Sequence, residues 1–140
     1  MKKMENRYPV LKYVSALQEL GSPFVSLYIE ETTRQLFIAI RYGRSENGYK
    51  SFICFPVSVE EILSYLNEQT GLITLLKKQK KFFNIKSDET EDTVISAVNT
   101  FTPDNRIEKM NIFDPELCDD LVWTNIFLKR ISENRPIETI

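Results

Sequence analysis

The side chains with the clearest binding chemistry in this chain form a short lysine-rich segment, which lies just before the aromatic pair Phe82-Phe83. Ammonium groups neutralise phosphates and aromatic rings stack on bases, so the pattern is typical of a nucleic-acid contact. A sequence pI of about 5.3 argues against a wholly basic face. The same lysines also suit an acidic protein partner or a solvated sheet edge. The candidate residues are Lys77, Lys78, Lys80 and Lys81.

Acidic side chains dominate the C-terminal part of the chain. Residues 88–140 contain twelve acidic and five basic side chains. Among the acids, Asp119 and Asp120 favour either a solvated helix face or an acidic face that attracts a basic partner. Trp123 follows them closely and is either a core residue or, if it is exposed, an interface anchor.

The residue patterns of common catalytic and metal sites are missing from the sequence. The chain has no histidine, and no serine is followed three residues later by lysine, which argues against the familiar serine hydrolases. Two cysteines cannot form a zinc cluster, and we expect Cys54 and Cys118 to be buried free thiols. We therefore predict a non-catalytic protein with no cofactor and no metal. An enzyme that uses Mg²⁺ bound to carboxylates such as Glu30-Glu31 is the third hypothesis, after protein binding and nucleic-acid binding.

Length and composition predict one globular domain. The chain has 140 residues, of which 42% are hydrophobic and 27% charged, as in an ordinary soluble protein. Its apolar runs are shorter than the roughly 18 residues of a membrane helix, and the basic N-terminus leads into no apolar signal core. We expect a cytoplasmic protein without membrane association, a single domain over residues 1–140, and a flexible tail at residues 133–140.

β-branched and aromatic residues predict an antiparallel sheet in the middle of the chain. The near-continuous apolarity of Gln35–Ile40 favours a strand that is buried on both faces. Asn47-Gly48 predicts a hairpin turn, because this pair readily adopts positive φ angles. Residues 8–20 have mixed signals and favour a strand, and residues 93–101 are also rich in strand formers. The main strands are predicted at residues 24–30, 35–42 and 49–55.

Two helices are predicted to pack on this sheet. Ser58 and Glu61 have the spacing of a capping box, which predicts a helix over residues 58–68 that ends before Gly71. Asp114-Pro115 supplies an N-cap acid and a proline at the first helical position, which predicts a C-terminal helix over residues 115–132. The expected fold class is therefore α+β, with a small antiparallel sheet covered by helices.

Four short patterns in the middle of the chain resemble those of a small, uncharacterised bacterial domain family of unknown function. The family pattern has an acid where this chain has Thr74, and the resemblance covers only residues 22–77. It implies a three-strand-plus-helix core in a bacterial or phage protein, and it implies no activity. The patterns are Gln35–Ile40, Phe55–Ser58, Glu60–Leu63 and Gly71–Leu76.

These observations favour an interaction protein of a bacterium or phage. We expect it to act by protein–protein contact, as an inhibitor, an immunity protein or an accessory protein in defence or counter-defence. The alternative is a nucleic-acid-binding module that uses the lysine-rich segment. Pairing of edge strands would also allow a homodimer.

Overall fold

The fold is built on one antiparallel sheet in which each strand pairs with the next strand along the chain. The computed structural model describes residues 10–44, 50–79, 82–87, 93–98 and 105–135. Within these ranges the sheet has six strands in the order β1-β2-β3-β4-β5-β6, with every neighbouring pair antiparallel. The strands are β1 (Leu11–Leu20), β2 (Ser22–Glu30), β3 (Gln35–Arg44), β4 (Lys50–Val57), β5 (Phe82–Ser87) and β6 (Thr93–Val98).

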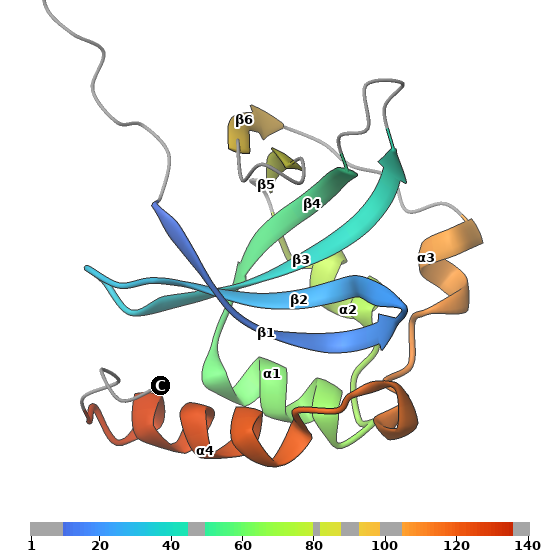
Figure 1. Ribbon diagram of the computed structural model, residues 1–140. Coiled ribbons are helices and arrows are strands. Elements are labelled where there is room, and N and C mark those ends of the chain that lie inside the picture. The colour runs from blue at the N-terminus through green and yellow to red at the C-terminus, as the bar shows by residue number, and fades with distance from the viewer. Residues whose placement is uncertain (1–9, 45–49, 80–81, 88–92, 99–104, 136–140) are drawn as a thin grey trace, which may run out of the picture.

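Helices pack against one face of this sheet, which confirms the α+β fold class and the presence of a C-terminal helix. In Figure 1, α1 and α4 lie side by side beneath β1 and β2, and their residues share one hydrophobic core with the sheet. The helical elements are α1 (Val59–Leu66), α2 (Leu72–Lys77), α3 (Asn105–Lys109), the short 3₁₀ helix η1 (Pro115–Leu117) and α4 (Leu121–Ser132).

The apolar run in β3 is buried on both faces, as the sequence predicts. Alternate side chains of a strand point to opposite faces, so Ile38 joins the helix-covered core while Phe37 and Ala39 join a second cluster. The second cluster contains Cys54 and Phe83, and Phe37 and Phe83 meet edge to face with ring centroids 6.2 Å apart. Burial on both faces therefore explains why this strand reads as continuously hydrophobic.

The first strand, β1, forms one edge of the sheet and is irregular. The strand predicted within residues 8–20 is confirmed, but its pairing with β2 shifts register three times. At the first shift Tyr13 pairs with Tyr28 and Ser15 pairs with Leu27, so Val14 is an extra residue on β1. Such a bulge bends the strand and changes where its side chains point.

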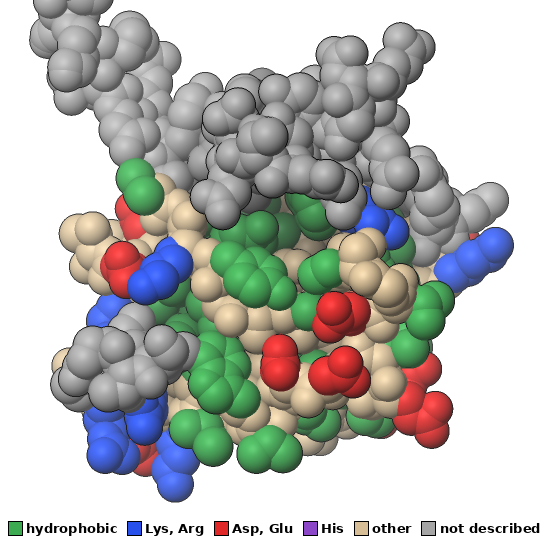
Figure 2. Space-filling model, viewed as in Figure 1, with side chains coloured by type: hydrophobic (Ala, Val, Ile, Leu, Met, Phe, Trp, Pro, Cys, Tyr) green, Lys and Arg blue, Asp and Glu red, His purple; other side chains and the backbone are tan. Residues whose placement is uncertain are grey.

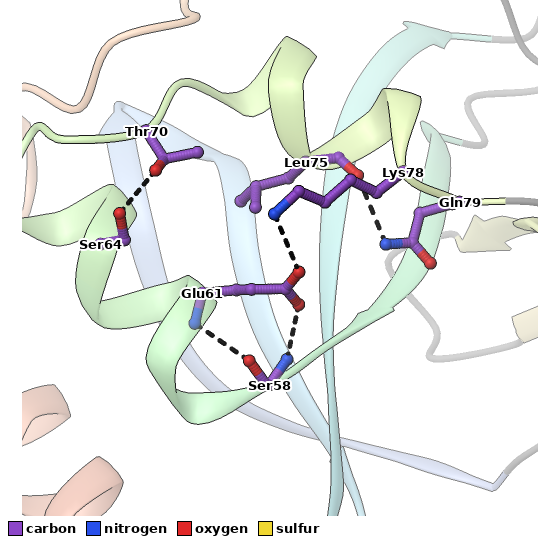
Figure 3. A network of polar contacts seen from close by, with 7 residues as sticks. All are labelled: Ser58, Glu61, Ser64, Thr70, Leu75, Lys78 and Gln79. Atoms are coloured by element: carbon purple, nitrogen blue, oxygen red, sulfur yellow. Dashed lines mark hydrogen bonds and ion pairs between the residues drawn. The ribbon is translucent and has the colours of Figure 1, made fainter.

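The cap of α1 is formed by the residues that the sequence indicates. The Ser58 hydroxyl accepts a hydrogen bond from the Glu61 backbone N–H at 3.1 Å, and the Glu61 carboxylate accepts one from the Ser58 N–H at 2.9 Å (Figure 3). The helix ends at Leu66 with Asn67 as its C-cap residue, and the positive φ angle of 62° belongs to Glu68. Gly71 is instead the N-cap residue of α2, so its predicted role as the stop of α1 is wrong.

The predicted C-terminal helix starts later than expected. Asp114 does cap a helical turn, because its side chain accepts a hydrogen bond from the Glu116 N–H at 3.0 Å. That turn is η1, which ends at Leu117, and α4 begins only at Leu121. Cys118 adopts an extended conformation between the two helices, so the chain changes direction before α4. The Asn47-Gly48 turn and residues 136–140 of the predicted tail lie outside the described residues.

Candidate functional site

A groove of about 440 Å³ lies between the start of β1 and α4. Five of its eight lining residues are aromatic or aliphatic and three are charged. Figure 2 shows hydrophobic side chains exposed on this face, with acidic side chains next to them. The lining residues are Lys12, Tyr13, Val14, Ile29, Glu31, Asp120, Trp123 and Phe127.

Aromatic rings line opposite sides of the groove. Trp123 stacks on Phe127 with ring centroids 5.6 Å apart and an angle of 17° between the ring planes. On the strand side, Tyr13 packs edge to face on Tyr28 with centroids 5.6 Å apart. Tyr13 is 49% exposed and Trp123 is partly buried, so each ring packs on an aromatic neighbour and stays partly accessible. Held rings of this kind offer contact area at a small entropic cost.

The charges around the groove are unequally compensated. The Lys12 ammonium forms an ion pair with the Glu31 carboxylate at 3.2 Å. For Asp120, by contrast, no cationic partner is found among the described residues, and the carboxylate remains exposed. Burial raises the pKa of the Tyr13 hydroxyl, and the carboxylates of Glu19 and Asp120 raise it further. Tyr13 is therefore a neutral hydrogen-bond donor beside carboxylates at neutral pH.

Buried polar contacts fix α4 against β1 and so create the groove. The hydroxyls of Ser15 and Thr124 are hydrogen-bonded at 2.9 Å in a buried position. Further along β1, the Gln18 side chain bonds the backbone of Asp114 twice, donating to its carbonyl at 2.8 Å and accepting from its N–H at 2.9 Å. Unsatisfied buried polar groups are costly, so the first pair holds α4, and the second holds the start of η1, against the strand.

Only part of the predicted acidic site belongs to this groove. Asp120 and Trp123 line it, whereas Asp119 is an exposed neighbour outside the lining. Trp123 combines the two roles that the sequence left open, because it packs against the main core and also faces the groove. Sequence reasoning missed Tyr13 and Phe127. The sequence favoured a strand within residues 8–20, but the position of Tyr13 beside Tyr28 depends on pairing with β2.

The aromatic neighbours of the lysine-rich segment do not support the prediction that this segment binds nucleic acid. Phe82 belongs to the main core and Phe83 to the second cluster, so both rings are buried and cannot stack on bases. Lys78 pairs with Glu61 at 3.6 Å, as Figure 3 shows, and Lys77 is exposed at the end of α2. Lys80 and Lys81 lie outside the described residues.

The described part of the chain contains no assembled site for a metal ion or for thiol chemistry. There, no three cysteine, aspartate or glutamate side chains gather closely enough to hold a metal ion. Cys54 and Cys118 are both buried free thiols, as the sequence predicts. Burial raises the pKa of each thiol, which disfavours the nucleophilic thiolate.

Comparison with known proteins gives no relative: no family model, no curated protein and no solved structure matches the chain. The resemblance of residues 22–77 to a bacterial domain family therefore stays a prediction. The longest helix in the described residues is α4, and none has the length and apolar character that a membrane span requires.

Proposed function

We propose that this protein is a non-catalytic interaction protein that binds a partner protein through the β1–α4 groove. The observation that carries the proposal is the pair of aromatic side chains, Tyr13 and Trp123, held on either side of an open groove. Tryptophan and tyrosine in partly formed pockets are the side chains that most often dominate binding energy at protein interfaces. The bacterial or phage origin and the role as an inhibitor, immunity protein or accessory protein in defence or counter-defence belong to the same proposal.

The surroundings of the groove support a protein partner better than a small molecule. Val10 is an exposed apolar side chain just before β1, one of the two elements that form the groove. A partner that covers Val10 together with the aromatic rings would remove apolar area from water. The carboxylate of Asp120 would add charge attraction to a basic side chain of that partner.

The test is capture of the partner from a native host lysate with a matched pair of variants of the full chain. Tyr13→Asp places a charge in the groove, whereas Leu20→Asp adds the same charge at the other end of β1, where Leu20 is 75% exposed. After nuclease digestion at moderate salt, we expect the wild type and Leu20→Asp to retain one stoichiometric protein that Tyr13→Asp loses.

Two results of this experiment would contradict the groove as the binding site. Equal capture by Tyr13→Asp would place the contact elsewhere on the molecule. Recovery of nucleic acid alone, and only when the nuclease is omitted, would favour the lysine-rich segment. In that case binding should weaken steeply with salt and fall when Lys77, Lys78, Lys80 and Lys81 are changed to glutamine.

With the partner purified, the groove can be observed directly. Trp123 is the only tryptophan in the chain, so its intrinsic fluorescence reports on the groove without a label. We expect a change in emission on binding that saturates at one partner per chain. A tight complex that leaves Trp123 emission unchanged would contradict the proposal.

A further inference from the structure

The outward face of α4 carries an apolar stripe that the protein itself does not cover. Val122 and Ile126 are 76% and 49% exposed, and they lie one helical turn apart on the same side. Lys129 continues this side towards the end of the helix and is also exposed. The opposite side of α4 supplies the core, through Thr124, Phe127 and Leu128.

Charge is polarised along the same helix. Asp119 and Asp120 lie at its N-terminal end, and Lys129 and Arg130 lie in its last turn. Figure 2 shows several acidic side chains right of the centre of this face and a group of basic side chains at its lower left. The helix dipole favours these signs, but it gives no reason for Val122 and Ile126 to be exposed between them.

We propose that this stripe binds a second copy of the chain, with the two α4 helices antiparallel across a two-fold axis at the level of Thr124. In this register Val122 of one copy packs on Ile126 of the other. Asp119 and Lys129 lie five positions before and after Thr124, so each meets its opposite charge on the second copy. An antiparallel arrangement is therefore self-complementary in both its apolar centre and its charged ends, as a two-fold interface requires.

The edge of β1 is less suited to self-association than this stripe. Its register shifts interrupt the regular row of backbone groups that a second strand would need, and exposed Lys12 lies on it. Its second half is also engaged, since Gln18 bonds Asp114 and the Cys118 thiol lies 3.7 Å from the Ala16 carbonyl oxygen. The homodimer expected from edge pairing is therefore better assigned to α4.

The interface is small, so the dimer should depend on concentration. The 12 residues of α4 span about 18 Å, and a contact centred on one short helix buries less than the roughly 1,600 Å² of a standard interface. We expect a dissociation constant weaker than about 1 µM, and a dimer that weakens as salt screens its charged ends.

A charge swap tests both the interface and its register. Sedimentation of the full chain over a wide concentration range should show a monomer–dimer equilibrium. Asp119→Lys and Lys129→Glu should each weaken the dimer at least tenfold, because each places like charges together twice. The double variant D119K/K129E should dimerise again, and so should an equimolar mixture of the two single variants.

Control variants distinguish this dimer from binding of a partner protein in the groove. Glu108→Lys changes the net charge as Asp119→Lys does, but on exposed α3, and should leave the dimer intact. Tyr13→Asp should abolish partner capture without changing the dimer. A wild type that stays monomeric at millimolar concentration would overturn the inference. So would a dimer that the single charge changes leave intact, or a double variant that fails to dimerise.

Discussion

The N-terminal ends of α1 and α4 both carry acidic side chains, but the protein uses them differently. At α1, Glu61 accepts from the Ser58 backbone and pairs with Lys78, so its carboxylate is engaged twice within the fold (Figure 3). At α4, the Asp120 side chain makes no capping hydrogen bond, and Asp119 beside it is exposed. The acid at α1 is therefore accounted for by helix capping, whereas the acids at α4 are available to another molecule.

The apolar faces of the two helices differ in the same sense. α1 directs Ile62, Tyr65 and Leu66 into the core and has no strongly exposed large apolar side chain. α4 buries one side but leaves Val122 and Ile126 largely in water. A helix whose polar and apolar side chains have partners within the protein contributes to the stability of the fold. A helix that leaves both kinds of side chain exposed on one face is a candidate binding surface.

The largest expected effect on stability comes from comparing a core residue of α1 with an exposed residue of α4. Ile62→Ala should lower the free energy of unfolding by about 2–5 kcal/mol, because it leaves a cavity in a fully buried position. Val122→Ala should change it by no more than about 0.5 kcal/mol in the monomer. Urea unfolding at low protein concentration measures both. Similar losses would mean that Val122 packs within its own chain.

A second test concerns the tight contact at the start of α2. A Cβ at Gly71 would collide with the Asn111 side chain, whose Oδ1 accepts from the Ile73 N–H at 2.7 Å. Gly71→Ala should therefore cost about 1–3 kcal/mol, since Asn111 can move only by breaking that bond. Thr74→Ala, at an exposed position on the same helix, is the control for unfolding measurements. An unchanged midpoint in Gly71→Ala would show that Asn111 adjusts freely.

Features that depend on a few neighbouring residues were predictable from the sequence. The α1 capping box needs only Ser58, Glu61 and a helical apolar pattern, and all three are local. The two-sided burial of β3 was likewise visible, because both sets of alternate side chains are apolar. In each case the physical cause lies within one short segment of chain.

Features that depend on distant segments were not predictable. The role of Gly71 is set by Asn111, which is 40 positions away, and α4 starts after the turn at Asp119 and Asp120 rather than at Asp114. The groove itself requires the Ser15–Thr124 contact, which joins residues 109 positions apart. Of the candidate site, the sequence therefore indicated Asp120 and Trp123 on α4 but not Tyr13 on β1.

The two helix starts should also respond differently to loss of their capping-position side chains. Ser58→Ala should cost about 1 kcal/mol, because it removes a capping hydrogen bond. Asp120→Ala should cost at most about 0.5 kcal/mol, since only an interaction with the helix dipole is lost, but it should weaken binding of the partner protein. Paired measurements of thermal unfolding and partner binding check this. A large stability loss in Asp120→Ala would make that acid structural, as Glu61 is.

The last expected effect concerns Tyr65 on α1 and has the opposite sign. Tyr65 is fully buried and packs on Phe113, but its hydroxyl has no hydrogen-bond partner among the described residues. Tyr65→Phe removes this unsatisfied group and should stabilise the protein by up to about 1 kcal/mol at pH 7. Equal or lower stability in urea would indicate a bound water or another partner for the hydroxyl.

The same substitution has a pH signature that separates it from a simple packing change. Burial raises the pKa of the Tyr65 hydroxyl above its ordinary value of 10.0, and the Cys118 thiol raises it further. Below pH 10 the hydroxyl is protonated in both the folded and the unfolded chain, so its ionisation costs no stability. As the pH rises above 10 the unfolded chain ionises first, and stability falls. Tyr65→Phe should therefore lose less stability than the wild type between pH 9 and about pH 11, and equal losses would show that Tyr65 does not titrate differently on folding.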